Sequence, residues 1–420
     1  MTPYISSRKN RCCRFKRVRI TLLLIILFLP ATYAYGGGFL IYSHDASAAA
    51  QGLAVTARAE NPSVVFYNPA AMNQLVDTEA SIGLSTIFTY ASYENTSGTK
   101  TDKEDQVFYV PNLFITHKMD DRISVGLGIF SPYGLSTDWP EGWEGRFVSK
   151  FAEITTVVVN PVVSWQITPR ISVAAGFDYL KSDFCMEKSF DTSAYGDPEV
   201  KCKLDAPGKG KGYNLALFAH LTDNVDFGVS YRSAIKVKYA GDVYFTDVAS
   251  FLTAFFPDGS TRCSIDLPAT AAAGLSARMG KWTFEFDLLW TGWSNLDELK
   301  ATFEQGLPTP GYYLVERHWK DTYRYCFGVN YMINKDINIR AGYIFDESPV
   351  PDNTLDPMVP DADSNAFSLG FGYNKGNLSC NVGYMAVFFE DRSTNSQVVG
   401  FNGRYETFMQ MAAINLSYAF

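Results

Sequence analysis

The sequence lacks the long apolar runs from which helical membrane proteins are built. Its mean hydropathy is −0.07 over 420 residues, whereas a polytopic helical membrane protein needs several runs of about 20 apolar residues. Charge is also scarce, because Asp, Glu, Lys and Arg make up only 19% of the chain and the 36 basic residues are outnumbered by 44 acidic ones. Since nucleic-acid binding requires a basic surface, the net charge of −8 argues against a nucleic-acid partner.

The motifs of common catalytic, nucleotide and metal sites are missing as well. The chain has no Cys-x-x-Cys pair, no Gly-x-Ser-x-Gly elbow and no Gly-x-x-x-x-Gly-Lys phosphate loop. Its four histidines are scattered. Ser43-His44-Asp45 contains the residue types of a catalytic triad, but residues that are consecutive in sequence rarely adopt the required geometry. We therefore expect no enzyme activity, no cofactor and no metal site.

Residues 1–34 have the composition of a secretory leader. They carry seven basic side chains and no acidic one, followed by the apolar run Ile20–Leu29 and small residues up to Ala34. A run of ten residues spans only about 15 Å as a helix, which is too short for a membrane anchor. We predict a signal peptide over residues 1–34 with cleavage after Ala34, so that the mature chain is exported.

Five of the seven cysteines lie beyond this leader, and two of them flank one predicted loop. These are Cys185 and Cys202, and export from the cytoplasm would permit a disulfide between them. The odd number of cysteines leaves at least one free thiol.

From about residue 79 onward the sequence alternates with a period of two. Within 225–239 the odd positions are mostly apolar, including Phe227, Tyr231 and Val237, while the even positions are mostly polar. Such alternation predicts strands with one apolar and one polar face, and we expect the odd residues of this range to share one face. Fourteen strands are predicted, over residues 79–93, 106–119, 122–132, 154–167, 171–184, 211–222, 225–239, 267–279, 281–293, 321–333, 336–346, 365–374, 377–389 and 407–420.

The connections between these strands alternate strictly in length. Short turns such as Asp223-Asn224 alternate with long loops such as 185–210 and 240–266. A closed antiparallel sheet with all short turns at one end is typical of a bacterial outer-membrane barrel, and closure is required because a lipid-exposed edge would leave backbone groups unsatisfied. The predicted fold is therefore all-β, a 14-stranded antiparallel transmembrane β-barrel over residues 79–420.

Residues 35–78 do not alternate, and small residues suited to short helices and tight turns are frequent among them. The apolar stretch Val64–Tyr67 would be costly to leave in water. We predict that this region folds into the lumen as a hatch, or plug, with a flexible periplasmic tail as the alternative.

Four motifs extend together over nearly the whole chain after the leader. They are Val65-Phe66-Tyr67-Asn68-Pro69-Ala70-Ala71; Ser131-Pro132-Tyr133-Gly134-Leu135 with Trp143-Glu144-Gly145-Arg146-Phe147; Leu267-Pro268-Ala269-Thr270 with Trp290-Thr291-Gly292-Trp293-Ser294; and Trp319-Lys320-Asp321-Thr322-Tyr323-Arg324 with the segments 345–351 and 360–363. These motifs resemble those of the FadL-type family of long-chain fatty acid and hydrocarbon transporters.

The resemblance implies an N-terminal hatch and a lateral exit at a bend in the third strand, through which an apolar substrate leaves into the membrane. Here Gly126 and Gly128 lie within that strand and Pro132 ends it. Glycine permits a bend, and proline cannot donate to the ladder. We expect the hatch residues Asn68, Pro69 and Ala70 to couple the hatch to this exit.

A fatty acid requires an apolar cavity for its tail and a cation for its carboxylate. The predicted cationic ligand residues are Lys320, Arg146 and Lys188, because a buried cation is expensive unless it is paired. Their alternative partners are Asp321 for Lys320 and Glu144 or Asp138 for Arg146, whereas Lys188 would be a solvated loop charge. Apolar contacts in an outer loop are expected from Phe251, Phe255 and Phe256, either as a capture groove or as ordinary loop packing.

The expected function is passive uptake of long-chain fatty acids or similar hydrophobic molecules by a monomer embedded in outer-membrane lipid. An aromatic hydrocarbon channel and a general diffusion porin are the alternatives. The second of these would need an open polar lumen and no apolar hatch. An additional adhesin or receptor role of the outer loops stays open.

Overall fold

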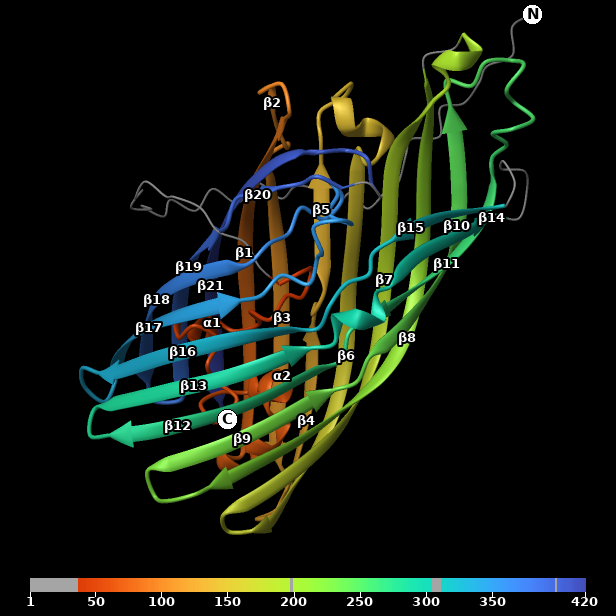
Figure 1. Cartoon of the computed structure of the whole chain (residues 1–420). Helices are drawn as coiled ribbons and strands as arrows, with labels where there is room; N and C mark the ends of the chain where they lie inside the picture. The colour runs from red at the N-terminus through yellow and green to blue at the C-terminus, as the bar shows by residue number, and fades with distance from the viewer. Residues whose placement is uncertain (1–36, 197–198, 304–310, 397–398) are drawn as a thin grey trace, which may run out of the picture.

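The structure is a computed structural model that describes residues 37–196, 199–303, 311–396 and 399–420, so the predicted leader lies outside the described residues. The described residues form a closed antiparallel β-barrel of fourteen wall strands, which confirms the predicted fold (Figure 1). The barrel closes where β1 pairs with β21. No helix within the described ranges is long and apolar enough to cross a membrane.

Several wall strands are interrupted and therefore carry two labels. In chain order the wall consists of β1 (Thr78–Asn95), β3 (Gln106–Lys118), β4 and β5 (Ile123–Phe130, Gly134–Asp138), β6 (Phe151–Thr168), β7 (Ile171–Asp191), β8 (Glu199–His220), β9 and β10 (Val225–Arg232, Ile235–Thr246), β11 and β12 (Gly259–Leu267, Thr270–Met279), β13 and β14 (Trp282–Thr291, Glu298–Phe303), β15 and β16 (Tyr312–Glu316, Thr322–Met332), β17 (Ile337–Asp346), β18 (Ser364–Lys375), β19 (Leu378–Phe389) and β21 (Gly403–Ala419). Two short strands, β2 (Lys100–Asp102) and β20 (Arg392–Ser393), pair with β1 and β21 at the long-loop end.

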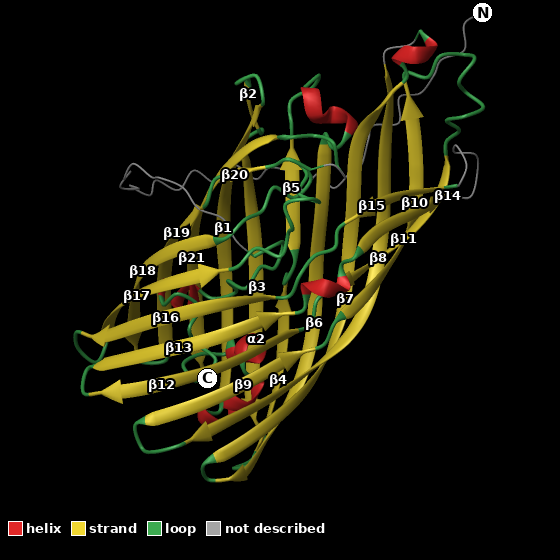
Figure 2. Ribbon diagram, in the orientation of Figure 1, coloured by secondary structure: helices red, strands yellow, loops and turns green. Residues whose placement is uncertain are grey.

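Helices are few and short in the described part of the chain (Figure 2). They are the α-helices α1 (Ala46–Ala50) and α2 (Val64–Tyr67) and the 3₁₀-helices η1 (Pro69–Gln74), η2 (Glu144–Phe147), η3 (Ser193–Tyr195) and η4 (Trp293–Asn295). The first three belong to the region before the wall.

The alternation observed in the sequence produces the two faces of the wall, with one correction. The expectation that the odd residues of 225–239 share one face is wrong, because Ser233 and Ala234 interrupt the strand between β9 and β10. Before the interruption even residues such as Arg232 point inward; after it, Val237 and its odd neighbours are the buried ones. Because side chains alternate with a period of two, an interruption can exchange the two faces of a strand.

Two predicted loops are also shorter than expected. The range 185–210 is largely an extension of the hairpin β7–β8, whose alternate residues Val200, Leu204 and Ala206 are buried. Likewise, β10 and β11 extend into the range 240–266. In Figure 1 these strands reach beyond the rest of the barrel at the long-loop end.

The two cysteines that flank the predicted loop do not form a disulfide with each other. Cys202 is a free, buried thiol. In the register of β7 and β8, Cys202 lies opposite Lys188, whereas Cys185 lies opposite Asp205. The offset of three residues corresponds to about 10 Å along the strands, which exceeds the reach of a disulfide.

Residues 37–77, which we call the N-terminal segment, lie inside the barrel. α1 contacts β17, β18 and β19, and η1 contacts β6, β7 and β8. The wall approaches this segment through inward-facing glycines: a Cβ atom on Gly228 would lie 2.1 Å from the Thr56 carbonyl oxygen, and one on Gly370 would lie 2.2 Å from the Ala50 Cβ. The segment therefore packs on the backbone of the wall itself.

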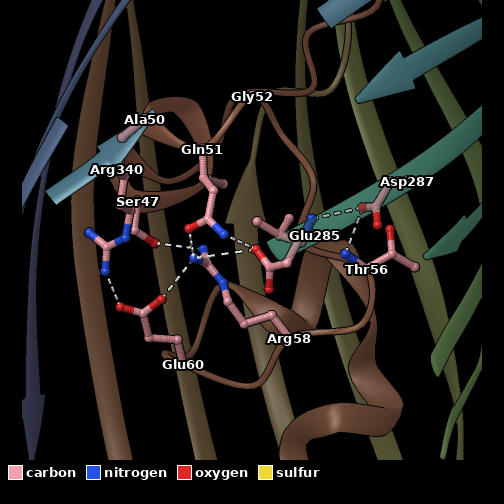
Figure 3. A network of polar contacts seen from close by, with 12 residues as sticks. Ser47, Ala50, Gln51, Gly52, Thr56, Arg58, Glu60, Glu285, Asp287 and Arg340 are labelled. Carbon is pink, nitrogen blue, oxygen red and sulfur yellow. Dashed lines mark hydrogen bonds and ion pairs between the residues drawn. The ribbon is translucent and has the colours of Figure 1, made fainter. Parts of the chain in front are cut away.

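Polar contacts also join the N-terminal segment to the wall (Figure 3). Arg58 forms an ion pair with Glu60 (Nη1–Oε2 2.9 Å), and Glu60 pairs in turn with Arg340 of β17. Asp287 of β13 accepts hydrogen bonds from the backbone amides of Val55 and Thr56, both at 2.7 Å. Arg340 and Asp287 are buried whereas Glu60 is partly open to solvent, so loss of the partner of Arg340 or Asp287 would leave a costly unpaired buried charge.

Candidate functional site

Aromatic side chains gather inside the barrel where the start of the N-terminal segment meets the wall and the outer loops. Phe39 packs on Trp293 (ring centroids 4.7 Å apart) and on Trp319 (5.7 Å). Nearby, Phe66 packs on Tyr42 at 5.2 Å and on Phe130 at 4.9 Å. All these rings are buried. The group, which we call the aromatic site, comprises Phe39, Tyr42, Phe66, Phe130, Tyr133, Trp293 and Trp319.

Two glycines allow the chain to enter this crowded site. Gly37 and Gly38 have φ angles of +111° and +62°, a region that favours glycine. A Cβ atom on Gly38 would lie 2.7 Å from the Trp293 ring, and one on Gly37 would lie 2.4 Å from the Asp346 carboxylate. The glycine run therefore serves both the backbone conformation and the close packing.

Two arginines lie against the aromatic rings. The guanidinium of Arg232 lies 5.2 Å from the ring centroids of both Phe66 and Phe130 and forms a buried ion pair with Asp178. Arg324 lies 5.8 Å from the Tyr42 centroid, and its Nη2 is 2.5 Å from Asp346 Oδ2. The site thus combines an apolar lining with two cations that already have carboxylate partners.

Two nitrogen atoms of this region have no hydrogen-bond partner among the described residues. They are the indole Nε1 of Trp319 and Nε of Arg324. Trp319 is 3% exposed. Because buried donors are nearly always paired, these groups leave unused hydrogen-bonding capacity inside the aromatic site.

The third wall strand is interrupted beside the aromatic site. β4 ends at Phe130 and β5 begins at Gly134. β3 pairs with β4 only through residues 113–118, and the described pairings of β5 are with β6 alone. The edge of β3 over residues 107–112 therefore has no ladder partner on this side among the described residues, which leaves a gap in the hydrogen-bonded wall.

The N-terminal segment supplies backbone contacts at this interruption. Ile41 N–H donates to Pro132 O at 2.8 Å, and Gly134 N–H donates to Phe39 O at 3.0 Å. The outer end of the gap is closed by a hydrogen bond from Glu104 N–H to Asp138 O at 2.8 Å. The interruption is thus bounded on the outside by the loops and on the inside by residues 39–41.

Comparisons with known proteins agree with this architecture. Residues 27–420 match the family described as "Outer membrane protein transport protein (OMPP1/FadL/TodX)". The chain belongs to this family. A long-chain fatty acid transport protein of Salmonella typhi is 24% identical over 399 residues, covering 86% of this chain and 90% of its own.

Solved structures show the same fold at low sequence identity. A FadL homologue of Pseudomonas aeruginosa has a TM-score of 0.83 at 19% identity, covering 91% of this chain and 99% of its own. The toluene transporter TodX of Pseudomonas putida has a TM-score of 0.73 at 17% identity, covering 93% and 99% respectively. Family membership and the closed barrel place this OMPP1/FadL/TodX protein in the bacterial outer membrane, as predicted.

The predicted ligand residues of this family member lie in different surroundings. Lys320 is exposed, and its backbone amide donates to Pro349 O at 3.0 Å. Arg146 is partly exposed, with Nε 2.5 Å from Glu199 Oε2 and the guanidinium 4.3 Å from the Phe147 ring centroid. Their ligand roles stay predictions.

The third predicted cation, Lys188, lies in a small apolar cluster of the outer extension. It is 8% exposed, its Nζ donates to the Tyr313 hydroxyl at 3.0 Å, and it lies 5.1 Å from the Phe190 centroid. Phe256 joins the same cluster, 5.6 Å from Phe190. Phe251 and Phe255 are 61% and 56% exposed on the same outer loop.

The predicted hatch residues bond to the wall at two strands. Asn68 Nδ2 donates to Leu217 O of β8 at 3.1 Å, and the Ala70 carbonyl accepts from Ser164 of β6 at 3.3 Å. Pro69 is the first residue of η1.

The contact with the third strand is made by other residues of the N-terminal segment. A Cβ atom on Gly126 would lie 2.6 Å from Met72 Sδ, and one on Gly128 would lie 3.0 Å from Val65.

Trp319 and Arg324 are the functional candidates that the sequence-based selection missed. Both belong to the motif from which Lys320 was selected. For Arg324, the sequence signal was the alternation along residues 322–332. It places Arg324 on the same inward face as Thr322 and Cys326. No sequence signal showed that the Trp319 indole would meet Phe39.

Proposed function

We propose that this protein takes up long-chain fatty acids or similar hydrophobic molecules by passive diffusion, and that it is not an enzyme. The observation that carries the proposal is the aromatic site, which holds orphaned hydrogen-bond donors and adjoins an interruption of the barrel wall. Two named relatives support the substrate class, since one is a long-chain fatty acid transport protein and another a toluene transporter.

The first step is capture at the outer extension. Lys188 is nearly buried among aromatic rings, and no carboxylate pairs with it in the described part of the chain. A fatty acid carboxylate would neutralise this cation, while its tail would lie against Phe190 and Phe256. The lysine thus provides the head-group contact, and the rings provide the apolar surface.

The second step is binding at the aromatic site. A carboxylate there would accept a hydrogen bond from the Trp319 indole N–H and face the Arg324 guanidinium. Charge-assisted hydrogen bonds of this kind are about twice as strong as neutral ones. An aromatic hydrocarbon would use the same rings but leave the indole N–H unpaired.

The third step is lateral exit at the interruption between β4 and β5, with residues 35–78 acting as the hatch. In the described part of the chain, two backbone hydrogen bonds, at Pro132 and Gly134, join residues 39–41 to this point. Moving these residues would connect the aromatic site to the gap beside β3, where the molecule enters the membrane. The packing of Val65 and Met72 on Gly126 and Gly128 couples the rest of the hatch to the same strand.

The substitution Trp319→Phe tests the proposal and separates its two substrate classes. It removes the indole N–H and keeps an aromatic ring. Losing a hydrogen bond to a charged group costs about 1.5–3 kcal/mol, so we expect fatty acid binding to weaken roughly 10- to 150-fold. Toluene binding should change much less. Equal losses for both ligands, measured by titration in detergent, would show that Trp319 makes no head-group contact.

Conductance distinguishes the proposal from a general diffusion porin. The N-terminal segment contacts wall strands on several sides of the barrel, so the purified monomer should show no large, stable open channel in planar bilayers. Mass spectrometry of co-purified molecules then identifies the substrate class. A large open conductance in the wild-type protein would favour the porin.

A further inference from the structure

Five lysines lie side by side on the outer surface of three neighbouring strands. Lys181 belongs to β7, Lys209 and Lys211 to β8, and Lys236 and Lys238 to β10. All five side chains are exposed. We call this group the lysine patch.

The strand register places three of these charges in one row. Lys181 lies opposite Lys209, and Lys209 lies opposite Lys238. Neighbouring strands are about 4.8 Å apart, and like charges directly opposite each other are destabilising. A row of this kind costs free energy in the isolated protein, and an anion bound along it would remove that cost.

Carboxylates of the protein do not neutralise the row. Of the five lysines, only Lys236 has an ion pair among the described residues, with Asp266 at 3.2 Å, and both of these side chains are exposed. The nearest acidic side chains on the same strands are Asp183, Asp205 and Asp242, which lie further toward the outer ends of β7, β8 and β10. They mark the outer limit of the patch.

The inner limit of the patch is the lipid-facing band of the barrel. Tyr179 on β7, Tyr213 on β8 and Tyr231 on β9 occupy the outward positions next to the lysines, and the rings of Tyr213 and Tyr231 are 6.1 Å apart. Below them, Phe177 and Leu215 are 46% and 49% exposed. Tyrosines form the belt at which hydrocarbon meets head groups, so the lysine patch lies at head-group depth on the long-loop side.

The interruption at Ser233 and Ala234 determines which side chains of β10 face outward. It turns Lys236 and Lys238 outward and their apolar neighbours inward. On β8, the glycines that alternate with the lysines leave room for those neighbours: a Cβ atom on Gly210 would lie 2.4 Å from Ile235. The result is a closely packed inner face beneath an outer face on which the five lysines are close neighbours.

We propose that the lysine patch binds the phosphate groups of an anionic lipid in the outer leaflet of the membrane. Lysine binds phosphate as a point charge, and basic clusters at head-group depth are typical of sites for anionic lipids. The chain as a whole has a net charge of −8, so the attraction is local to this surface. The site is separate from the proposed transport route, because these side chains point away from the lumen.

The test compares lipid binding by two matched triple variants of the full-length barrel. The first carries Lys181→Gln, Lys209→Gln and Lys238→Gln. The control carries the same change at Lys281, Lys335 and Lys375, three exposed lysines at or beside short turns at the other end of the barrel. Native mass spectrometry measures binding of lipid A with two phosphates and of the same lipid after dephosphorylation.

We expect the wild type and the control to prefer the phosphorylated lipid and the first variant to lose this preference. Each lysine should strengthen binding of the phosphorylated lipid about fivefold. Replacing three of them should therefore weaken that binding by on the order of a hundredfold. Equal binding of the two lipids by the wild type, or unchanged binding by the first variant, would overturn the proposal. If that variant does not assemble, a salt titration of the wild type tests whether lipid binding depends on the phosphate charges. Binding of the phosphorylated lipid must then weaken with salt while binding of the dephosphorylated lipid does not.

Discussion

The substitution Gly342→Val would test whether the N-terminal segment closes the lumen by packing on the backbone of the wall. Gly342 faces inward on β17, and a Cβ atom there would lie 2.1 Å from the Gly52 nitrogen and 2.4 Å from the Gln51 carbonyl carbon. An ordinary contact begins at 3.4 Å, so the turn at residues 51–52 must move by 1.3 Å (3.4 − 2.1) or more. Because both atoms belong to the backbone, rotation of a side chain cannot relieve the overlap.

The contacts that this movement breaks determine the free-energy penalty of the substitution. Gly52 N–H donates to Ser368 Oγ at 3.0 Å, and Gln51 Nε2 donates to the buried Glu285 carboxylate. Leaving a buried group unpaired costs about 1–3 kcal/mol. Two such losses predict a penalty of about 2–6 kcal/mol on the seated N-terminal segment, which shifts the ratio of seated to displaced molecules by roughly 30-fold or more.

Single-channel recording in planar bilayers measures this shift as open events that the wild type lacks, and thermal unfolding should occur at a lower temperature. Ala341→Val is the matched control, because Ala341 is the neighbour on β17 whose side chain faces lipid. If the Gly342 variant stays as closed and as stable as this control, the contact with the wall does not hold the segment in place.

Three further substitutions test the loops and the site. Burial raises the carboxyl pKa of the loop residue Asp361 from 3.8 to about 7, so the folded state retains a proton that the unfolded state releases. Stability should therefore fall as the pH rises from about 4 to 7, and Asp361→Asn should flatten this fall in thermal unfolding. Arg324→Gln leaves Asp346 buried without its cation, which should cost about 3–5 kcal/mol; adding Asp346→Asn should restore much of the loss in denaturant unfolding. Lys188→Gln should slow fatty acid uptake at low substrate concentration in a cell-based assay, whereas Lys201→Gln, at an exposed lysine, should not.

Much of the wall could be predicted because its signals are local. An outward residue such as Phe227 and its inward neighbour Gly228 differ in polarity or size, so a few consecutive residues show the alternation. A short turn such as Asp223-Asn224 can likewise be identified from the chain on either side of it. Prediction failed where a short interruption intervened: the break at Ser233 exchanged the two faces of the strand. The pattern of apolar residues continues across this break without a visible change.

The candidate site could be predicted only as a motif. The motif from Trp319 to Arg324 points to the right segment, but its sequence favours the cation Lys320, whereas the Trp319 ring and the inward-facing Arg324 lie in the aromatic site. The question of a disulfide between Cys185 and Cys202, which the sequence left open, was decided by the strand register. Cys185 and Cys202 face each other across a predicted loop in the sequence, but the strand register sets them three residues apart.

The sequence by itself determined a closed antiparallel barrel in the outer membrane, because alternation and connection lengths are properties of short stretches of chain. Only the tertiary structure decided which inward side chains meet. Phe39, Phe130, Trp293 and Trp319 lie far apart in sequence, and their contacts exist only once the barrel has closed around the N-terminal segment. The same holds for the lysine row, since the register between β7, β8 and β10 depends on how the strands pair and not on any one of them alone.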